Sequence, residues 1–140
     1  MEPIEVAAGV VRAADGRVLL CRRQGKLDGL WEFPGGKREA GETFQQCLER
    51  ELMEELELDV AAGDILGEVM RTENGRALRL VFVSAVCRFP SQPMRLHVHG
   101  KAAWAAPAGI AAYPLCPADA AFVAQGGLDG RIHQETSNKE

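Results

Sequence analysis

Residues 31–60, WEFPGGKREAGETFQQCLERELMEELELDV, join a glycine-rich stretch to a strongly acidic segment. Six of the last twelve residues of this run are Asp or Glu. Like charges three or four positions apart destabilise a helix by about 0.2–0.5 kcal/mol per pair. The concentration of carboxylates directly behind glycines therefore needs a physical reason, and it decides the interpretation of the whole chain.

The acidic segment is predicted to be a helix. Thr43 and Gln46 have the spacing of a capping box, in which each side chain bonds the backbone of the other. We expect the helix to begin at about Phe44 and to end at Leu56 or Leu58.

Some of the acids do not lie where a solvated face would place them. At about 100° per residue, four apolar residues form one stripe: Phe44, Leu48, Leu52 and Leu56. Glu55 projects into the sector of Leu48, and Glu51 lies at the edge of the stripe. Glu54 lies well away from the centre of the stripe. The three acids are therefore neighbours on a surface that begins at the border of the core, where Mg²⁺ is the natural counter-ion. A purely structural acidic helix is the alternative.

The rest of the chain is typical of a mixed α/β fold. Strands are expected at Ile4–Val11, Arg17–Cys21, Trp31–Phe33, Ile65–Thr72, Arg76–Cys87 and Lys101–Ala105. Hairpin turns are expected at residues 15–16 and 74–75, and a turn or loop at 34–36. Residues 117–125 should form a short helix that begins with proline. This order predicts a mixed β-sheet with helices on both faces.

The composition is that of one globular domain, which we place at residues 1–125, with 126–140 as a flexible C-terminal tail. No apolar run approaches the roughly 20 residues of a membrane span, so no membrane partner is expected. Four scattered cysteines without a Cys-x-x-Cys pair favour reduced thiols in a cytoplasmic protein. The net charge of -4 disfavours a nucleic acid duplex as partner, and the oligomeric state is left open.

The spacing of the glycine, the acids and one arginine resembles a known family motif. Gly36, five residues, Glu42, seven residues and then Arg-Glu-Leu-Met-Glu-Glu at 50–55 resemble the Nudix box, G-x5-E-x7-R-E-U-x-E-E-x-G-U, where U is a bulky aliphatic residue. Glu57 stands where the family has glycine, and Leu58 then fits the pattern. Glu57 also places an acid at the negative end of the helix, which predicts an altered helix end.

The likeness extends along about 125 residues. Three parts resemble the MutT-type branch: the hairpin that ends at residues 21–23, the run 31–37, and Trp104 followed by the run 113–119. The late segment is most similar to bacterial CTP pyrophosphohydrolases. The resemblance implies a Nudix α/β/α sandwich and a Mg²⁺-dependent hydrolase of small-molecule nucleotides. Such an enzyme converts a nucleoside triphosphate and water into a nucleoside monophosphate and pyrophosphate.

The resemblance also implies the metal-binding and catalytic residues by position. Glu51, Glu54 and Glu55 would be the catalytic acids that ligate Mg²⁺, or Mn²⁺ in its place. The Gly35 carbonyl is a further candidate ligand. Glu51 would also orient or deprotonate the attacking water. The number of metal ions and the phosphorus that is attacked are left open.

Four more residues receive roles by position. Glu42 and Arg50 would form a pair that braces the loop against the helix. Arg23 and Lys37 would neutralise phosphate oxygens.

One departure from the family pattern bears on the general base. Relatives often have a glutamate in the loop before the last strand, but here that loop reads His-Val-His-Gly, and Val98 occupies the position. Three outcomes follow: Glu51 carries the base role, His97 or His99 substitutes, or catalysis is weak or lost and the fold only binds nucleotides. The two histidines also fit a merely solvated loop.

The nucleobase pocket would be lined by apolar residues that are equally suited to the core: Ile4, Val6, Phe33 and Leu78. Asp119 carries more information, because an ionised aspartate only accepts hydrogen bonds and suits the exocyclic amine of cytosine. A protonated aspartate would serve a purine, and Asp119 also fits a helix cap. We therefore expect cytosine nucleotides (CTP, dCTP or modified dCTP), with 8-oxo-dGTP as the alternative.

Overall fold

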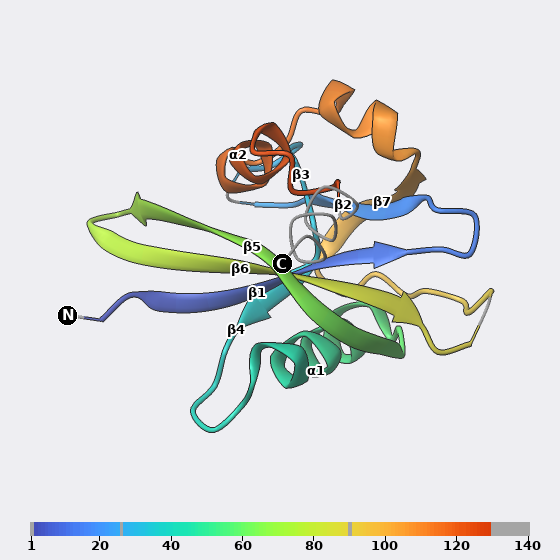
Figure 1. Ribbon diagram of the computed structural model, residues 1–140, viewed down its shortest axis with the longest axis horizontal. Helices are drawn as coiled ribbons and strands as arrows, with labels where there is room; N and C mark the ends of the chain where they lie inside the picture. Colours follow the sequence, from blue (N-terminus) through green and yellow to red (C-terminus); the bar gives the residue numbers. More distant parts are fainter. Residues whose placement is uncertain (1, 26, 90, 130–140) are drawn as a thin grey trace, which may run out of the picture.

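The structure is a computed structural model that describes residues 2–25, 27–89 and 91–129 of the chain. A mixed sheet forms its centre, and one helix lies on each face (Figure 1). The elements in chain order are β1 (Ile4–Arg12), β2 (Val18–Arg23), β3 (Trp31–Glu32), β4 (Gly35–Lys37), α1 (Phe44–Leu56), β5 (Val60–Glu73), β6 (Arg76–Cys87), β7 (His99–Ala105), the 3-10 helix η1 (Pro107–Ala112) and α2 (Pro117–Ala124). The predicted α/β/α sandwich is confirmed.

The sheet has the strand order β3-β2-β1-β6-β5, with β4 paired to β1 and β7 paired to β2. Strands β1 and β6 run parallel, and the other pairs are antiparallel. Asn74 and Gly75 both have positive φ, which makes the predicted hairpin turn between β5 and β6. The hairpin at residues 15–16 is shorter than expected, because β1 and β2 meet only at Arg12 and Val18 and β2 then pairs with β7.

Each face of the sheet has its own hydrophobic core. Helix α1 buries Leu48, Leu52 and Leu56 against one face. On the other face, the rings of Phe82 and Phe122 stack with their centroids 4.1 Å apart, beneath α2. Burial of these side chains holds both helices to the sheet and so fixes the acids of α1 relative to the strands.

Helix α1 begins as the sequence predicts. The Thr43 hydroxyl accepts a hydrogen bond from the Gln46 amide at 3.0 Å, and the Gln46 side chain accepts one from the Thr43 amide at 2.9 Å. The helix ends at Leu56, and Glu57 follows in the left-handed conformation with φ 53°. Its amide donates to the carbonyls of the last turn, as glycine usually does at this place.

The prediction of a turn or loop at residues 34–36 is wrong at the glycines. Gly35–Lys37 form strand β4, which pairs with Val6–Ala8 of β1. A Cβ atom on Gly35 would lie 1.8 Å from the Ala7 carbonyl oxygen, so only glycine allows this approach. The glycine run therefore brings one backbone against another instead of reversing the chain.

Smaller differences concern lengths and ends. Strand β5 begins at Val60, five residues before the predicted start, because it pairs with the end of β6. The 3-10 helix η1 was not predicted from the sequence; it begins without a side-chain cap. Residues 126–129, expected to begin the tail, make turn hydrogen bonds, and Arg12 donates to the Leu128 carbonyl at 2.8 Å. The remainder of the expected tail, 130–140, lies outside the described residues.

In the described part of the chain, no helix is both long enough and apolar enough to cross a membrane.

Candidate active site

A cavity of about 450 Å³ collects residues from all seven strands and both helices. The site residues predicted from sequence that line it are Val6, Arg23, Gly35, Lys37, Glu55, Leu78 and Asp119. Of the metal-binding candidates that line the cavity, Gly35 comes from β4 and Glu55 from α1. Asp119 comes from the first turn of α2. The cavity thus joins residues that are up to 113 positions apart, from Val6 to Asp119.

The acids of α1 differ in exposure, as the helical geometry predicts. Glu51 is 14% exposed in its side chain, whereas Glu54 is 58% exposed. Glu55 is half-buried and lies beside Glu51. Burial, together with the neighbouring carboxylates of Glu51, Glu32 and Glu54, raises the pKa of Glu55 to about 8. Two acidic side chains, Glu51 and Glu55, thus share one partly buried site.

Gly36 provides the space in which Glu51 lies. A Cβ atom built on Gly36 would lie 2.2 Å from the Glu51 carboxyl carbon and 2.3 Å from one of its oxygens. Any larger residue would therefore displace this carboxylate. Pairing of β4 with β1 fixes the backbone at this point, so the strand determines where the acid can be.

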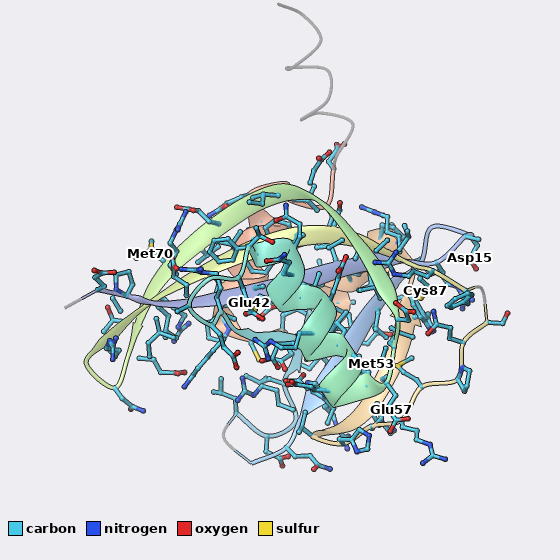
Figure 2. All side chains as sticks on the ribbon, turned by 90° about the horizontal axis from the view of Figure 1, so that it is seen from below. Asp15, Glu42, Met53, Glu57, Met70 and Cys87 are labelled. Carbon is cyan, nitrogen blue, oxygen red and sulfur yellow. The ribbon has the colours of Figure 1, made fainter. Side chains whose placement is uncertain are left out.

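Arg50 connects the acidic helix to the preceding segment. Its guanidinium donates to Glu42 at 2.9 Å, to Glu51 at 2.9 Å and to the Lys37 carbonyl at 3.1 Å. A further bond reaches Glu54 at 3.3 Å. The hydrogen bond from Arg50 lowers the pKa of Glu42 to about 2. The predicted pair of Glu42 and Arg50 is present, and Figure 2 shows Glu42 alongside α1.

The chemistry of these acids fits a hard divalent cation. Within the described residues, no three His, Cys, Asp or Glu side chains already converge as a complete ligand set. Arg50 donates hydrogen bonds to both Glu51 and Glu54. Burial and the adjacent carboxylates raise the pKa of Glu55, so a cation bound beside it would favour its ionised form. Carboxylate oxygens are the ligands that Mg²⁺ and Mn²⁺ prefer.

Sequence reasoning missed Glu32, which links two cavity residues. One carboxylate oxygen of Glu32 pairs with Arg23 at 3.3 Å, and the other lies 2.8 Å from Nε2 of His99. The His99 side chain is only 4% exposed, and its Nδ1 is buried without a hydrogen-bond partner. No sequence spacing could have shown this contact, because Glu32 and His99 are 67 positions apart.

His97, in the loop before β7, and His99, the first residue of β7, both contact carboxylates. His97 places Nε2 at 2.6 Å from Glu57, in the same way that His99 contacts Glu32. The loop is therefore more than a solvated connection. Val98 is 51% exposed and lines the cavity between them.

The base-binding candidates are only partly brought together. Val6 and Leu78 line the cavity, joined by Leu80. Ile4 pairs with Leu78 across the sheet and is not among the lining residues. Phe33 is buried in the core against Phe82 and Phe122, and does not line the cavity either.

Asp119 is 4% exposed and does not cap α2. Its carboxylate accepts a hydrogen bond from the Phe33 amide at 3.0 Å, which ties the helix to the end of β3. Burial raises the pKa of Asp119 to about 7, against the opposing effect of that hydrogen bond. Near neutral pH, both the ionised and the protonated forms are therefore populated.

Arg71 is a second cavity residue that sequence reasoning missed. It lies on β5, and its Nε is buried without a hydrogen-bond partner. An unpaired buried donor costs about 1–3 kcal/mol, so its presence in a cavity points to a function. The only sequence signal was alternation along β5, which places Arg71 on the face of the buried Val69.

The raised pKa of Asp119 predicts a pH-dependent stability. Between its unfolded pKa near 3.8 and its folded pKa near 7, the folded state binds more protons than the unfolded state. Protonation of Asp119 therefore makes its full contribution to the free energy of unfolding below about pH 4, and this contribution is lost as the pH rises through 7. Asp119→Asn removes this titration, so the Tm of the wild type minus that of the variant should fall by about 5 °C or more from pH 4 to pH 8. A difference that is constant across this range would contradict the burial of a titrating carboxylate.

Comparison with known proteins supports the same family. The NUDIX domain family matches residues 3–126. CTP pyrophosphohydrolase of Escherichia coli (strain K12) is 38% identical over 121 residues, covering 85% of this chain and 87% of that protein. A putative 8-oxo-dGTP diphosphatase 2 of Mycobacterium tuberculosis is 35% identical over 127 residues, covering 89% of this chain and 87% of that protein.

Solved structures agree with the fold. The solution structure of the E. coli ORF135 protein superposes with a TM-score of 0.76 at 31% identity, covering 99% of this chain and 95% of that chain. The MutT protein of Methanosarcina mazei Go1 has a TM-score of 0.75 at 23% identity, which shows the fold alone, and covers 99% and 98%. Together with the glycine strand and the acidic helix, these matches show that the chain belongs to the NUDIX family, as a Nudix hydrolase that acts on nucleotide pyrophosphate bonds.

Proposed function

We propose that this protein is a divalent-cation-dependent nucleoside triphosphate pyrophosphohydrolase that prefers cytosine nucleotides. The observation that carries the proposal is the adjacent pair of Glu51 and Glu55 beside β4, because Glu55 lines the same cavity as Asp119. The reaction consumes water and releases a nucleoside monophosphate and pyrophosphate. The pairing of acids supports the chemistry, and Asp119 supports the choice of base.

The proposed site residues divide the work by charge. Glu51, Glu54 and Glu55 would hold the cation, with the Gly35 carbonyl as a further ligand. A cation bound there would supply Lewis-acid activation of the phosphoryl group. Arg23 and Lys37 line the same cavity, and would neutralise phosphate oxygens as negative charge develops.

Glu51 is the best candidate for the group that accepts a proton from the attacking water. Val98 has no group that can take a proton. His97 and His99 already direct Nε2 at Glu57 and Glu32, which makes either a weaker candidate in this arrangement. The Glu51 carboxylate occupies the space that Gly36 leaves beside β4, and it lies next to Glu55.

The base preference rests on Asp119. In its ionised form it accepts a hydrogen bond, as the exocyclic amine of cytosine requires. The name of the E. coli relative, CTP pyrophosphohydrolase, is in keeping with this choice. The second candidate is 8-oxo-dGTP, which the M. tuberculosis relative is named for. The raised pKa of Asp119 keeps that candidate open, because the protonated carboxyl group can also donate to a purine edge.

The proposal is tested by measuring pyrophosphate release from a panel of ribo- and deoxyribonucleoside triphosphates, including 8-oxo-dGTP, with Mg²⁺ and with Mn²⁺. We expect the largest kcat/KM for a cytosine nucleotide and no release in the presence of a chelator. Binding of nucleotides without release from any of them would show instead a binding module that has lost catalysis.

Asp119→Asn should change the order of substrates. An amide both donates and accepts, so we expect kcat/KM for cytosine nucleotides to fall by about tenfold relative to purine nucleotides. The dependence on Mg²⁺ concentration should not change, because Asp119 is not among the proposed metal ligands. The same panel, assayed on the variant, is the measurement; an unchanged order of substrates would remove Asp119 from base recognition.

A further inference from the structure

We propose that Glu57 and His97 form a clasp that fastens the loop before β7 to the end of α1 and so positions the mouth of the substrate cavity. Here the clasp means the contact between these two side chains and the backbone bonds beside it. The inference rests on the proposed function for its kinetic consequence. The contact itself is independent of it, because it joins residues outside the proposed metal and base sites.

The first observation is the conformation of Glu57. Its φ of 53° lies in the left-handed region, which is unfavourable for a residue with a Cβ atom. An acid at the C-terminal end of a helix is also disfavoured by the helix dipole. Glycine would avoid both costs, so the glutamate at this position calls for a compensating contact.

That contact is made with the loop that contains Val98. Nε2 of His97 lies 2.6 Å from the Glu57 carboxylate, and both side chains are about half exposed. In Figure 2, Glu57 lies with Met53 at the end of α1, where the chain leaves the helix. The chain departs from the Nudix pattern at positions 57 and 98. The His97 side chain connects the two positions, because it contacts Glu57 and belongs to the residue directly before Val98.

Backbone hydrogen bonds extend the clasp along the loop. The Arg95 amide donates to the Leu56 carbonyl at 2.9 Å, and the His97 amide donates to the Glu55 carbonyl at 3.0 Å. These carbonyls belong to the last turn of α1, where they have no partner within the helix. The loop therefore satisfies the end of the same helix that carries the acids of the site.

The far end of the loop is anchored inside the cavity. His99 is buried and contacts Glu32, which in turn pairs with Arg23. Val98 lies between the two anchors and lines the cavity. Release of the outer anchor at His97 would let residues 95–98 move away from α1, so substrate would meet a less defined cavity mouth. This makes Glu57 and His97 positioning residues.

Three variants separate positioning from simple stability. Glu57→Gly removes the carboxylate and relieves the left-handed strain, so we expect Tm to be equal or higher while KM rises about three- to tenfold. His97→Ala should raise KM by the same factor, and the double variant by no more than either single change. Glu57→Gln, whose amide oxygen can still accept from Nε2, should keep KM within about twofold of the wild type.

Glu49→Gln is the matched control, because it makes the same change of charge on the same helix. Its carboxylate contacts the Ala62 amide and Arg88 instead of the loop, so KM should not change. A KM unchanged in both Glu57→Gly and His97→Ala would overturn the proposal. The proposal would also be overturned if the increases in KM of the two single variants multiplied in the double variant.

Amide hydrogen exchange tests the clasp without turnover. We expect the amides of Arg95 and His97 to exchange about tenfold faster in Glu57→Gly than in the wild type, with the amides of β1 unchanged. If the wild type hydrolyses no nucleotide, the proposed function fails, and exchange alone then decides the clasp. Equal exchange rates in wild type and variant would overturn it.

Discussion

Glu55→Gln is expected to lower the rate of pyrophosphate release by about 10³-fold without unfolding the protein. A cation at this site is worth several kcal/mol to the transition state, and each 1.36 kcal/mol corresponds to a factor of ten. Glutamine keeps the shape of the side chain but offers a neutral oxygen, which is a weaker ligand for a hard cation. The loss should appear in kcat as well as in kcat/KM.

The same substitution should leave the metal-free protein as stable as the wild type. Burial and the adjacent Glu51 carboxylate raise the pKa of Glu55 to about 8, so the wild-type side chain is mainly protonated at neutral pH in the absence of a cation. Glutamine resembles that protonated form in charge and size. The Tm without metal should therefore stay within a few degrees, or rise slightly.

Metal binding gives a readout that does not depend on turnover. A ligand that binds only the folded state raises its stability by RT ln(1 + [L]/Kd), so Mg²⁺ should raise the Tm of the wild type. Glu55→Gln should weaken or abolish this increase, and Glu49→Gln, on the same helix, should retain it. Turnover within tenfold of the wild type in Glu55→Gln would exclude this residue from the catalytic machinery.

The long helix could be predicted from the sequence because its signals are local. The capping box of Thr43 and Gln46 fixes the start, and the period of the leucines fixes the buried face. Those two facts also determine that Glu51 and Glu55 lie at the border of the core while Glu54 is exposed. The β5–β6 hairpin was predictable for the same reason, since Asn74-Gly75 favours the turn by its own backbone preference.

The parts that were missed depend on contacts between distant segments. Residues 35–37 form a strand because β1 is available for pairing, and no local preference of glycine predicts this. Glu32 and His99 meet across 67 positions, and Glu57 and His97 across 40. Arg71 is brought to the cavity by the pairing of β5 with β6. Each contact follows from the topology of the sheet, which the sequence pattern restricts only to a class of folds.

The two adjacent glycines of β4 should respond differently to the same substitution. In Gly36→Ala the new methyl group would meet the Glu51 carboxylate at 2.2–2.7 Å, which is the far end of a flexible side chain. Glu51 can move aside, so the fold should survive with a Tm within a few degrees of the wild type. Displacing a catalytic group by about 1 Å can cost about 100-fold in rate, and we expect a loss of that order in kcat.

In Gly35→Ala the methyl group would meet backbone instead. It would lie 1.8 Å from the Ala7 carbonyl oxygen and 2.8 Å from its carbon, and neither atom can move without separating β4 from β1. We expect the free energy of unfolding to fall by about 3 kcal/mol, measured by urea denaturation. Equal losses of stability in the two variants would show that Gly36 serves the strand and not the carboxylate. A stable but inactive Gly36→Ala beside an unstable Gly35→Ala would instead show that one glycine shapes the sheet while its neighbour leaves room for Glu51.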